Sequence, residues 1–380
     1  MNLFNVYKKW EVTPVYGKGA YVYDQKHTPY LDFYGGHAVI SIGHQHPHFV
    51  QKIQHQLQQL AFYSNAVPNE LQEELALKLG QLSGLPDFQL FLCNSGAEAN
   101  ENALKLASFY NDRSKIIAFK KAFHGRTSAA VNITANEKIK APINKTFDVE
   151  FHEWQNIESV KRSLEKGDVC AVIIEGIQGI GGVHIPAPDF LEDLATACKK
   201  QNTLLILDEI QSGYGRSGHF FAYQQSTITP DLITIAKGMG NGFPIGGVLI
   251  HPKFEASAGL LGSTFGGNHL ACSAGIAVLD VIQEEQLLKN AQHLGSYLAQ
   301  ALQSLDEVQE VRAMGLMIGL QFDFPIKELS QHLLYHEQVF TGSSSCPKTL
   351  RILPPLTINQ EEVDLFLEKI TSSISKLAFA

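Results

Sequence analysis

The stretch that decides the fold is TLLILDEIQSGYGRSG, Thr203 to Gly218, together with DLITIAKGMGNG, Asp231 to Gly242. Each part contains a short, continuous apolar run, Leu204–Leu207 in the first and Leu232–Ala236 in the second. Runs of this length and composition are typical of strands buried on both faces of a parallel sheet. The sequence therefore predicts an α/β fold built around these buried strands.

Charged residues stand where both strands end. The first run stops at Asp208 and Glu209, and the second stops at Lys237. Ligands of open α/β sheets bind beyond the carboxyl ends of the strands, so an acid and a lysine are expected at one site. This pair suits pyridoxal 5′-phosphate, whose aldehyde needs a lysine amine and whose ring nitrogen needs an anion. We expect Lys237 to form the Schiff base and Asp208 to face the ring nitrogen.

Taken alone, this pair is also compatible with two different roles. An apolar run that ends in two acids is typical of the magnesium-binding strand of a nucleotide hydrolase. That class of enzyme needs a GxxxxGK[ST] loop, and the only Gly-Lys pair, Gly17-Lys18, is followed by Gly19. A lone lysine after a strand is also commonly a solvated cap, so the pair does not decide the function by itself.

Composition narrows the class of protein. The chain has 380 residues, with 44% hydrophobic and 18% charged residues, which suits a two-domain globular enzyme. Its net charge of −8, without a basic run, argues against nucleic-acid binding. The five cysteines are scattered, no signal peptide is evident, and no apolar stretch could span a membrane. We therefore expect a reduced, cytoplasmic protein.

A candidate phosphate site follows the predicted strand Leu90–Cys93. The turn Asn94–Ala97 leads into a predicted helix over Glu98–Ala107. Helix N-termini present free N–H groups to anions, and we expect this turn to hold the cofactor phosphate. An ordinary serine cap at Ser95 would account for the turn equally well.

Further strands complete the predicted sheet. Lys115–Phe119 is followed by FHGRT at Phe123–Thr127, and Val169–Ile174 ends at Glu175. Strands and helices alternate up to Lys237, which predicts right-handed crossovers between parallel strands.

The two ends of the chain have a different character. Ala20–Asp24 and Tyr30–Phe33 predict a hairpin, and strands over Met317–Phe322 and Leu350–Leu353 predict a second, smaller sheet. HQHPH at His44–His48 allows a metal-site interpretation, but we expect a helix start there and no metal. The expected domains are an N-terminal segment of the small domain (1–48), a large cofactor-binding domain (49–252) and a C-terminal small domain (253–380).

Taken together, these segments resemble the class III pyridoxal-phosphate-dependent aminotransferases, and among them the acetylornithine, succinylornithine and ornithine aminotransferases. The matching motifs run in the family's order along nearly the whole chain. They are GHQHP (43–47), NSGAEANENALK (94–105), FHGRT (123–127), EGIQGIGG (175–182), LDEIQSGYGRSG (207–218), IAKGMGNGFPIG (235–246), GSTFGGN (262–268) and RILPPL (351–356). The resemblance implies an aspartate-aminotransferase-like fold, with a large, mainly parallel sheet domain and a smaller α+β domain.

The resemblance also implies roles for particular residues. Phe123 and Ile210 would flank the cofactor ring, and Gln211 would hydrogen-bond the ring hydroxyl. Thr264 would reach the phosphate of the neighbouring subunit, so a homodimer would share its active sites. The implied cofactor-binding residues are Ser95, Gly96, Ala97, Phe123, Asp208, Ile210, Gln211, Lys237 and Thr264.

Arg126 and Arg351 would anchor substrate carboxylates, as planar guanidinium groups do well. The family usually has a glutamate where this chain has Ile180, and that glutamate masks the arginine equivalent to Arg351. We therefore expect Arg351 to be unpaired unless Glu175 masks it. An unpaired guanidinium favours a donor with an extra carboxylate, as in N-succinylornithine.

The implied reaction moves the distal amine of an N-acylornithine to 2-oxoglutarate, giving a semialdehyde and glutamate, as in arginine biosynthesis. Alternatives are an ornithine or 4-aminobutyrate aminotransferase, an aminomutase on the same scaffold, and a catalytically silent binding relative. The intact Lys237 and Asp208 argue against a silent protein. The residues do not decide whether the acyl group is acetyl or succinyl.

Overall fold

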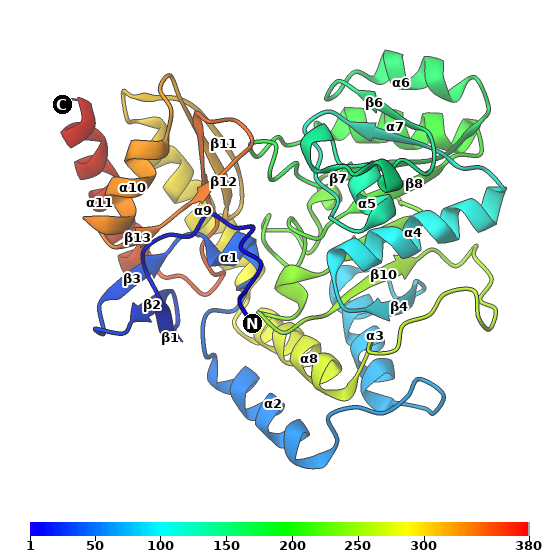
Figure 1. Cartoon of the computed structure of the whole chain (residues 1–380), viewed down its shortest axis with the longest axis horizontal. Helices are drawn as coiled ribbons and strands as arrows, with labels where there is room; N and C mark the ends of the chain where they lie inside the picture. The colour runs from blue at the N-terminus through cyan, green and yellow to red at the C-terminus, as the bar shows by residue number, and fades with distance from the viewer. Residues whose placement is uncertain (379–380) are drawn as a thin grey trace.

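A seven-stranded sheet forms the core of the larger lobe in the computed structural model, which describes residues 1–378 (Figure 1). The strand order is β4-β10-β9-β8-β7-β5-β6. The strands β9, β8, β7, β5 and β6 run parallel, whereas β10 is antiparallel to both β4 and β9. Their bounds are β4 Gln89–Cys93, β5 Lys115–Phe119, β6 Val149–His152, β7 Val169–Glu175, β8 Leu204–Asp208, β9 Leu232–Ile235 and β10 Gly246–Ile250. The expected mainly parallel α/β architecture is confirmed.

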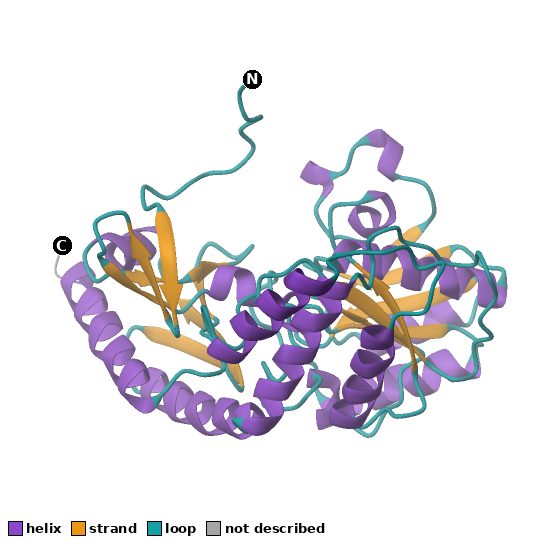
Figure 2. Cartoon of the chain, turned by 90° about the horizontal axis from the view of Figure 1, so that it is seen from below, coloured by secondary structure: helices purple, strands orange, loops and turns teal. Residues whose placement is uncertain are grey.

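Helices cover both faces of this sheet (Figure 2). Successive residues of β8 bury into opposite layers, since Leu205 and Leu207 join one hydrophobic cluster while Leu204 and Ile206 join another. Burial on both faces explains why the strand is a continuous apolar run. The helices of this lobe are α3 Glu70–Ser83, α4 Gly96–Asn111, α5 Ser128–Asn132, α6 Ile157–Leu164 and α7 Pro188–Lys200.

The smaller lobe combines the two ends of the chain. One sheet has the order β1-β2-β3-β13, in which β13 from the C-terminal part pairs with β3 in parallel, and a second has the order β11-β12-β15-β14. Their bounds are β1 Pro14–Lys18, β2 Tyr21–Asp24, β3 Pro29–Asp32, β11 Val308–Met314, β12 Met317–Phe322, β13 Val339–Phe340, β14 Gly342–Ser343 and β15 Thr349–Ile352. The predicted hairpin is present as β2 and β3, and β1 extends it by one further strand.

Long helices complete this part of the molecule. They are α8 His269–Glu284, α9 Leu287–Gln303, α10 Lys327–Tyr335 and α11 Gln360–Ala378. The N-terminus of α11 carries a reciprocal capping box, in which Glu362 N donates to Asn359 and Asn359 N donates to Glu362 at 2.9 and 3.0 Å.

The histidines of HQHPH precede or begin α2 (Pro47–Gln59), which packs against α8. Each histidine hydrogen-bonds a different carboxylate: His44 contacts Asp32, His46 contacts Glu285, and His48 contacts Asp280, at 2.8–2.9 Å. These contacts join separate segments of the chain. Within residues 1–378, no group of three or more His, Cys, Asp or Glu side chains is arranged to hold a metal ion.

The loop 262–268 is held in place by hydrogen bonds from other segments. The Asn65 amide donates to the carbonyl oxygens of Ser263 and Gly266, both at 3.0 Å, and Gln72 donates to the carbonyl of Gly267 at 2.8 Å. Gly266 and Gly267 are buried. Side-chain amides on the preceding segment and on α3 therefore fix this loop beside the end of β4.

Candidate active site

The expected acid and lysine line one cavity of about 380 Å³ at the carboxyl ends of the central strands. Asp208 is the last residue of β8, and Lys237 begins the short helix η4 (Lys237–Met239) just after β9. Because β8 and β9 are adjacent and parallel, their ends bring the two side chains to the same side of the sheet. Segments 94–97 and 123–126 complete one wall of the cavity.

Lys237 has an unusual backbone conformation and a free side chain. Its φ of 47° lies in the left-handed region, where a residue other than glycine costs about 1–2 kcal/mol. Strain of this kind is concentrated at functional sites. Burial lowers the pKa of the Lys237 amine to about 8, although Asp208 and Glu175 favour its charged form. Within residues 1–378, its Nζ makes no hydrogen bond or ion pair, so the amine is free to react.

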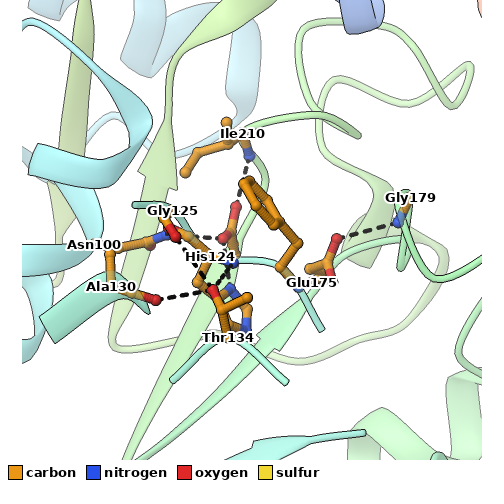
Figure 3. A network of polar contacts seen from close by, with 10 residues as sticks. Asn100, His124, Gly125, Ala130, Thr134, Glu175, Gly179 and Ile210 are labelled. Atoms are coloured by element: carbon orange, nitrogen blue, oxygen red, sulfur yellow. Dashed lines mark hydrogen bonds and ion pairs between the residues drawn. The ribbon is translucent and has the colours of Figure 1, made fainter. Parts of the chain in front are cut away.

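Asn100, His124 and Ile210, which Figure 3 shows together, all contact the carboxylate of Asp208. His124 Nδ1 and Asn100 Nδ2 lie 2.7 and 2.9 Å from its Oδ2, and Ile210 N donates to its Oδ1 at 3.1 Å. The aspartate is only 4% exposed. Both oxygens of this buried carboxylate are therefore hydrogen-bonded.

His124 holds the carboxylate of Asp208 from one side. Its Nδ1 lies against Oδ2, whereas its Nε2 is buried and has no partner among the described residues. His124 therefore orients Asp208 within the wall of the cavity.

The N-terminus of α4 borders the cavity. Ser95 is the N-cap and accepts a hydrogen bond from Glu98 N at 3.2 Å, so the cap interpretation of this serine is correct. The N–H groups of Gly96 and Ala97, in the first turn, have no acceptor within the helix. The cap at Ser95 therefore leaves these donors free, and they lie at the positive end of the helix dipole, as expected for a turn that holds a phosphate.

Phe123 and Ile210 lie on the cavity walls, as expected for groups that flank a flat ring. Ile210 packs so closely on Gly96 that a Cβ there would come within 2.7 Å of its side chain. Arg126 also lines the cavity, and its guanidinium lies 6.0 Å from the Phe123 ring centroid.

Glu175 lies in the cavity wall and does not mask Arg351 through a hydrogen bond. Its two carboxylate oxygens accept from Phe123 N and Gly179 N, both at 3.1 Å. Burial raises the pKa of Glu175 to about 7, because these two bonds only partly offset the loss of water.

Arg351 has no carboxylate that masks it among residues 1–378, as expected, but two neutral groups hold it. Its Nη1 donates to Gln211 Oε1 at 3.1 Å, and its Nε donates to the Ser343 carbonyl at 2.6 Å. This contact uses the amide oxygen of Gln211, the residue that was expected to hydrogen-bond the ring hydroxyl of the cofactor. Arg351 is 1% exposed, and no carboxylate of residues 1–378 pairs with it.

Thr264 does not line the cavity of its own chain. It is exposed at the surface, on the fixed loop next to Ser263. The side chain of Asn94 donates to Ser263 Oγ at 3.2 Å, so the loop lies close to the start of α4.

The comparison of the chain with protein-family models gives its identity. The model described as Aminotransferase class-III matches residues 5–374. The chain belongs to the class-III aminotransferases. It is accordingly a pyridoxal-phosphate-dependent aminotransferase, and pyridoxal 5′-phosphate is its cofactor.

Relatives of this class-III aminotransferase include acetylornithine aminotransferases. It is 38% identical to that of Bacillus subtilis (strain 168), over 98% of both chains. It is also 38% identical to that of Archaeoglobus fulgidus, over 97% of this chain and 96% of the relative.

Solved structures of similar proteins share the fold. Ornithine aminotransferase from Toxoplasma gondii superposes with a TM-score of 0.92, at 27% identity, over 99% of this chain and 93% of that one. An (S)-enantioselective omega-transaminase from Thermomicrobium roseum gives 0.88 at 26% identity, over 96% and 92%.

The cavity fits this cofactor. It has a free lysine amine, a buried aspartate, unsatisfied N–H groups at a helix N-terminus, and two apolar walls formed by Phe123 and Ile210.

None of the helices in residues 1–378 has both the length and the apolar character needed to cross a membrane.

Proposed function

We propose that this aminotransferase transfers the distal amine of an N-acylornithine to 2-oxoglutarate, giving the semialdehyde and glutamate in arginine biosynthesis. The observation that carries the proposal is the 38% identity to acetylornithine aminotransferase of Bacillus subtilis along essentially the whole chain. The ornithine aminotransferase from Toxoplasma gondii has the same fold, which is consistent with a donor derived from ornithine.

In this proposal the cofactor supplies an electrophilic aldehyde and a ring that withdraws electrons. Lys237 would bind the aldehyde carbon, and Asp208 would hold the proton on the ring nitrogen. The N–H groups of segment 95–97 would hold the phosphate, with Thr264 of a second subunit. Phe123 and Ile210 would flank the ring, and the second N–H of the Gln211 amide would donate to the ring hydroxyl.

Two arginines would bind the carboxylates of the substrates. Arg126 is exposed in the cavity wall and would hold the α-carboxylate of the donor. Arg351 would hold the carboxylate next to the reacting carbon of 2-oxoglutarate or glutamate. The amine of Lys237 would carry a proton away from the substrate carbon and return it, as base and then acid, for which a pKa of about 8 is suitable. Glu175 contributes a buried carboxyl group to the substrate side of the wall.

We further propose a cytoplasmic homodimer. All five cysteines are free, and four of them are buried, which suits a reducing compartment. The exposed position of Thr264, on a fixed loop outside its own cavity, suits a residue that completes the site of a second copy.

A donor panel tests the function. Each of N-acetylornithine, N-succinylornithine, ornithine and 4-aminobutyrate is mixed with 2-oxoglutarate, and glutamate formation is measured. We expect kcat/KM for one of the two acylated donors to exceed that for ornithine and 4-aminobutyrate at least tenfold. Equal or greater activity with ornithine or 4-aminobutyrate would contradict the proposal. Rearrangement of a donor without consumption of 2-oxoglutarate would indicate an aminomutase instead.

A further inference from the structure

The loop that carries Lys237 is short and strained. Lys237, Asn241 and Gly242 all have φ in the left-handed region, at 47°, 45° and 99°. The loop 237–242 closes one turn of its own, in which Gly240 N donates to the Lys237 carbonyl at 3.0 Å. Positive φ values are unfavourable at residues other than glycine, so a loop of this shape persists only where its surroundings hold it.

Asn241 binds a segment that lies about 200 positions earlier in the chain. Its Oδ1 accepts from Ser41 N at 2.9 Å and from Ile42 N at 3.1 Å, and its Nδ2 donates to the Gly43 carbonyl at 2.9 Å. Two N–H groups at one end and a carbonyl at the other fix the orientation of the amide. Asn241 and Ser41 are 7% and 2% exposed, so these bonds satisfy buried polar groups.

Ser41 makes a further bond to the same loop. Its Oγ donates to the carbonyl of Gly238, the residue next to Lys237, at 2.7 Å. A Cβ at position 238 would lie 3.4 Å from Ser41 Cβ, so the two segments are in close contact. Ser41 and Asn241 therefore hold the loop near both of its ends, and they restrain the backbone from which the Lys237 side chain extends.

Segment 41–43 is itself anchored on its other side. The Ser41 carbonyl accepts from Leu356 N at 2.7 Å. A Cβ at Gly43 would lie 2.9 Å from Thr357 Oγ1, so this part of the chain is packed tightly against the segment that follows β15. The smaller lobe thus supports segment 41–43 from behind, and the segment offers a fixed surface to the lysine loop.

We propose that Asn241 is a positioning residue for Lys237. Together with Ser41 it clamps the loop 237–242 to segment 41–43, and it thereby fixes the direction in which the Lys237 amine enters the cavity. Neither clamp residue is among the described residues that line the cavity, so both act through the backbone of the lysine. The proposal rests on the proposed function only in the role given to Lys237, and no amino donor is needed to test it.

The charges around the Lys237 amine do not come from the clamp. Burial lowers the pKa of this amine to about 8, while Asp208 and Glu175 favour its charged form and Arg351 disfavours it. Both clamp residues are neutral, so their substitution leaves these charges in place. A changed reactivity of the amine in a clamp variant therefore reports a change in its position.

Asn241→Gly and Ser41→Ala are the test variants. Glycine adopts the φ of 45° without strain, so Asn241→Gly removes the amide and still permits the turn. Ser41→Ala removes a single hydroxyl group and is the milder change. Asn132→Ala is the matched control, because this asparagine is 5% exposed and its Nδ2 donates to the Phe147 carbonyl at 2.9 Å, outside the cavity.

Methylamine is the probe. In the cofactor-loaded protein its nitrogen bonds to the aldehyde carbon and the Lys237 amine leaves, so the two amines compete for one atom. Borohydride then fixes the cofactor on whichever amine holds it, and peptide mapping gives the ratio of the two products. A well-placed lysine acts as an amine of high effective concentration, so a large excess of methylamine is needed to displace it.

We expect the methylamine concentration at half-displacement to fall at least tenfold in Asn241→Gly and at least threefold in Ser41→Ala, and to change less than twofold in Asn132→Ala. Tm and total bound cofactor are recorded for every variant, because general damage lowers both without changing the ratio of the two products. If Asn241→Gly does not fold, Ser41→Ala decides alone. Native midpoints in the test variants, or an equal fall in Asn132→Ala, would overturn the clamp.

The outcomes separate this inference from the proposed function. Cofactor mapped to Lys237, combined with native midpoints in the test variants, rejects the clamp and keeps the role of the lysine. Cofactor mapped to another lysine rejects that role and the clamp with it. Lowered midpoints without amine transfer from any N-acylornithine reject the proposed donor and keep the clamp.

Discussion

His124 makes the shortest contact with the carboxylate of Asp208, since its Nδ1 lies 2.7 Å from Oδ2. Asn100 adds a second donor to the same oxygen, at 2.9 Å. We regard both as positioning residues, because they act on the cofactor through Asp208.

A matched pair of substitutions tests this role. His124→Asn keeps an N–H group near the position of Nδ1, whereas His124→Leu removes it. Loss of a hydrogen bond to a charged group costs about 1.5–3 kcal/mol. We expect His124→Leu to lower kcat roughly 10- to 100-fold and to shift the pH dependence of the visible absorption of the bound cofactor, with a much smaller effect in His124→Asn. If the pH dependence of the cofactor absorption is unchanged in His124→Leu, His124 serves only to pack the wall of the cavity.

Some features of these residues could be predicted from the sequence, and others could not. The strand-end positions of Asp208 and Lys237 could be predicted, because each follows a continuous apolar run. The contacts of Arg351 could not, because its partner Gln211 lies 140 positions away, and the amide oxygen of Gln211 fits only because residue 179 is a glycine. Asn100 and His124 stand within recognised motifs, yet nothing local indicates that both reach one carboxylate oxygen.

Among the helices, α4 has an N-terminus with two roles: Ser95 caps the helix, and the N–H groups after it are proposed to hold the cofactor phosphate. Ser95 caps it, and the following N–H groups remain free. Gly96 is required here less for backbone freedom than for the space that Ile210 fills.

The variant Gly96→Ala separates the two roles of this helix. Alanine favours helix, so we expect little change in Tm. Its Cβ would push Ile210 away from the N-terminus of α4, and we expect the affinity for pyridoxal phosphate to fall at least tenfold. Fluorescence titration of the cofactor-free protein measures this affinity. Native affinity in Gly96→Ala would show that the cofactor does not use this end of the helix.

Elements are easier to predict than their arrangement. The apolar runs indicate β7, β8 and β9, and the capping box indicates the start of α11. The antiparallel position of β10 between β4 and β9 has no local signal, and neither does the pairing of β13 with β3, since both depend on how distant segments meet. The composition of the loop 262–268 is typical of a flexible segment, but amides from Asn65 and Gln72 fix it.

At the scale of the whole molecule, the proposed shared site requires a second copy of the chain. Phe265, beside Thr264, is 60% exposed and packs on Phe62 with ring centroids 5.1 Å apart. An exposed aromatic pair beside Thr264, the residue proposed to reach the partner's phosphate, suits a contact between subunits.

Subunit mixing tests the shared site. Lys237→Ala and Thr264→Arg should each be inactive alone. In a mixed dimer, one site combines Lys237 of one subunit with Thr264 of the other, and activity should return to a measurable fraction of the native value. Sedimentation at assay concentration provides the control for association. No recovery in proven mixed dimers would contradict sharing through Thr264.

The cavity between Asp208 and Lys237 is the proposed site of the cofactor. Borohydride reduction of the native, cofactor-loaded protein followed by peptide mapping tests it most directly, because reduction fixes the cofactor on the lysine that holds it. We predict loss of the visible absorption band and a single modified peptide that carries the cofactor on Lys237. A stable cofactor adduct on any other lysine, with Lys237 unmodified, would contradict the account.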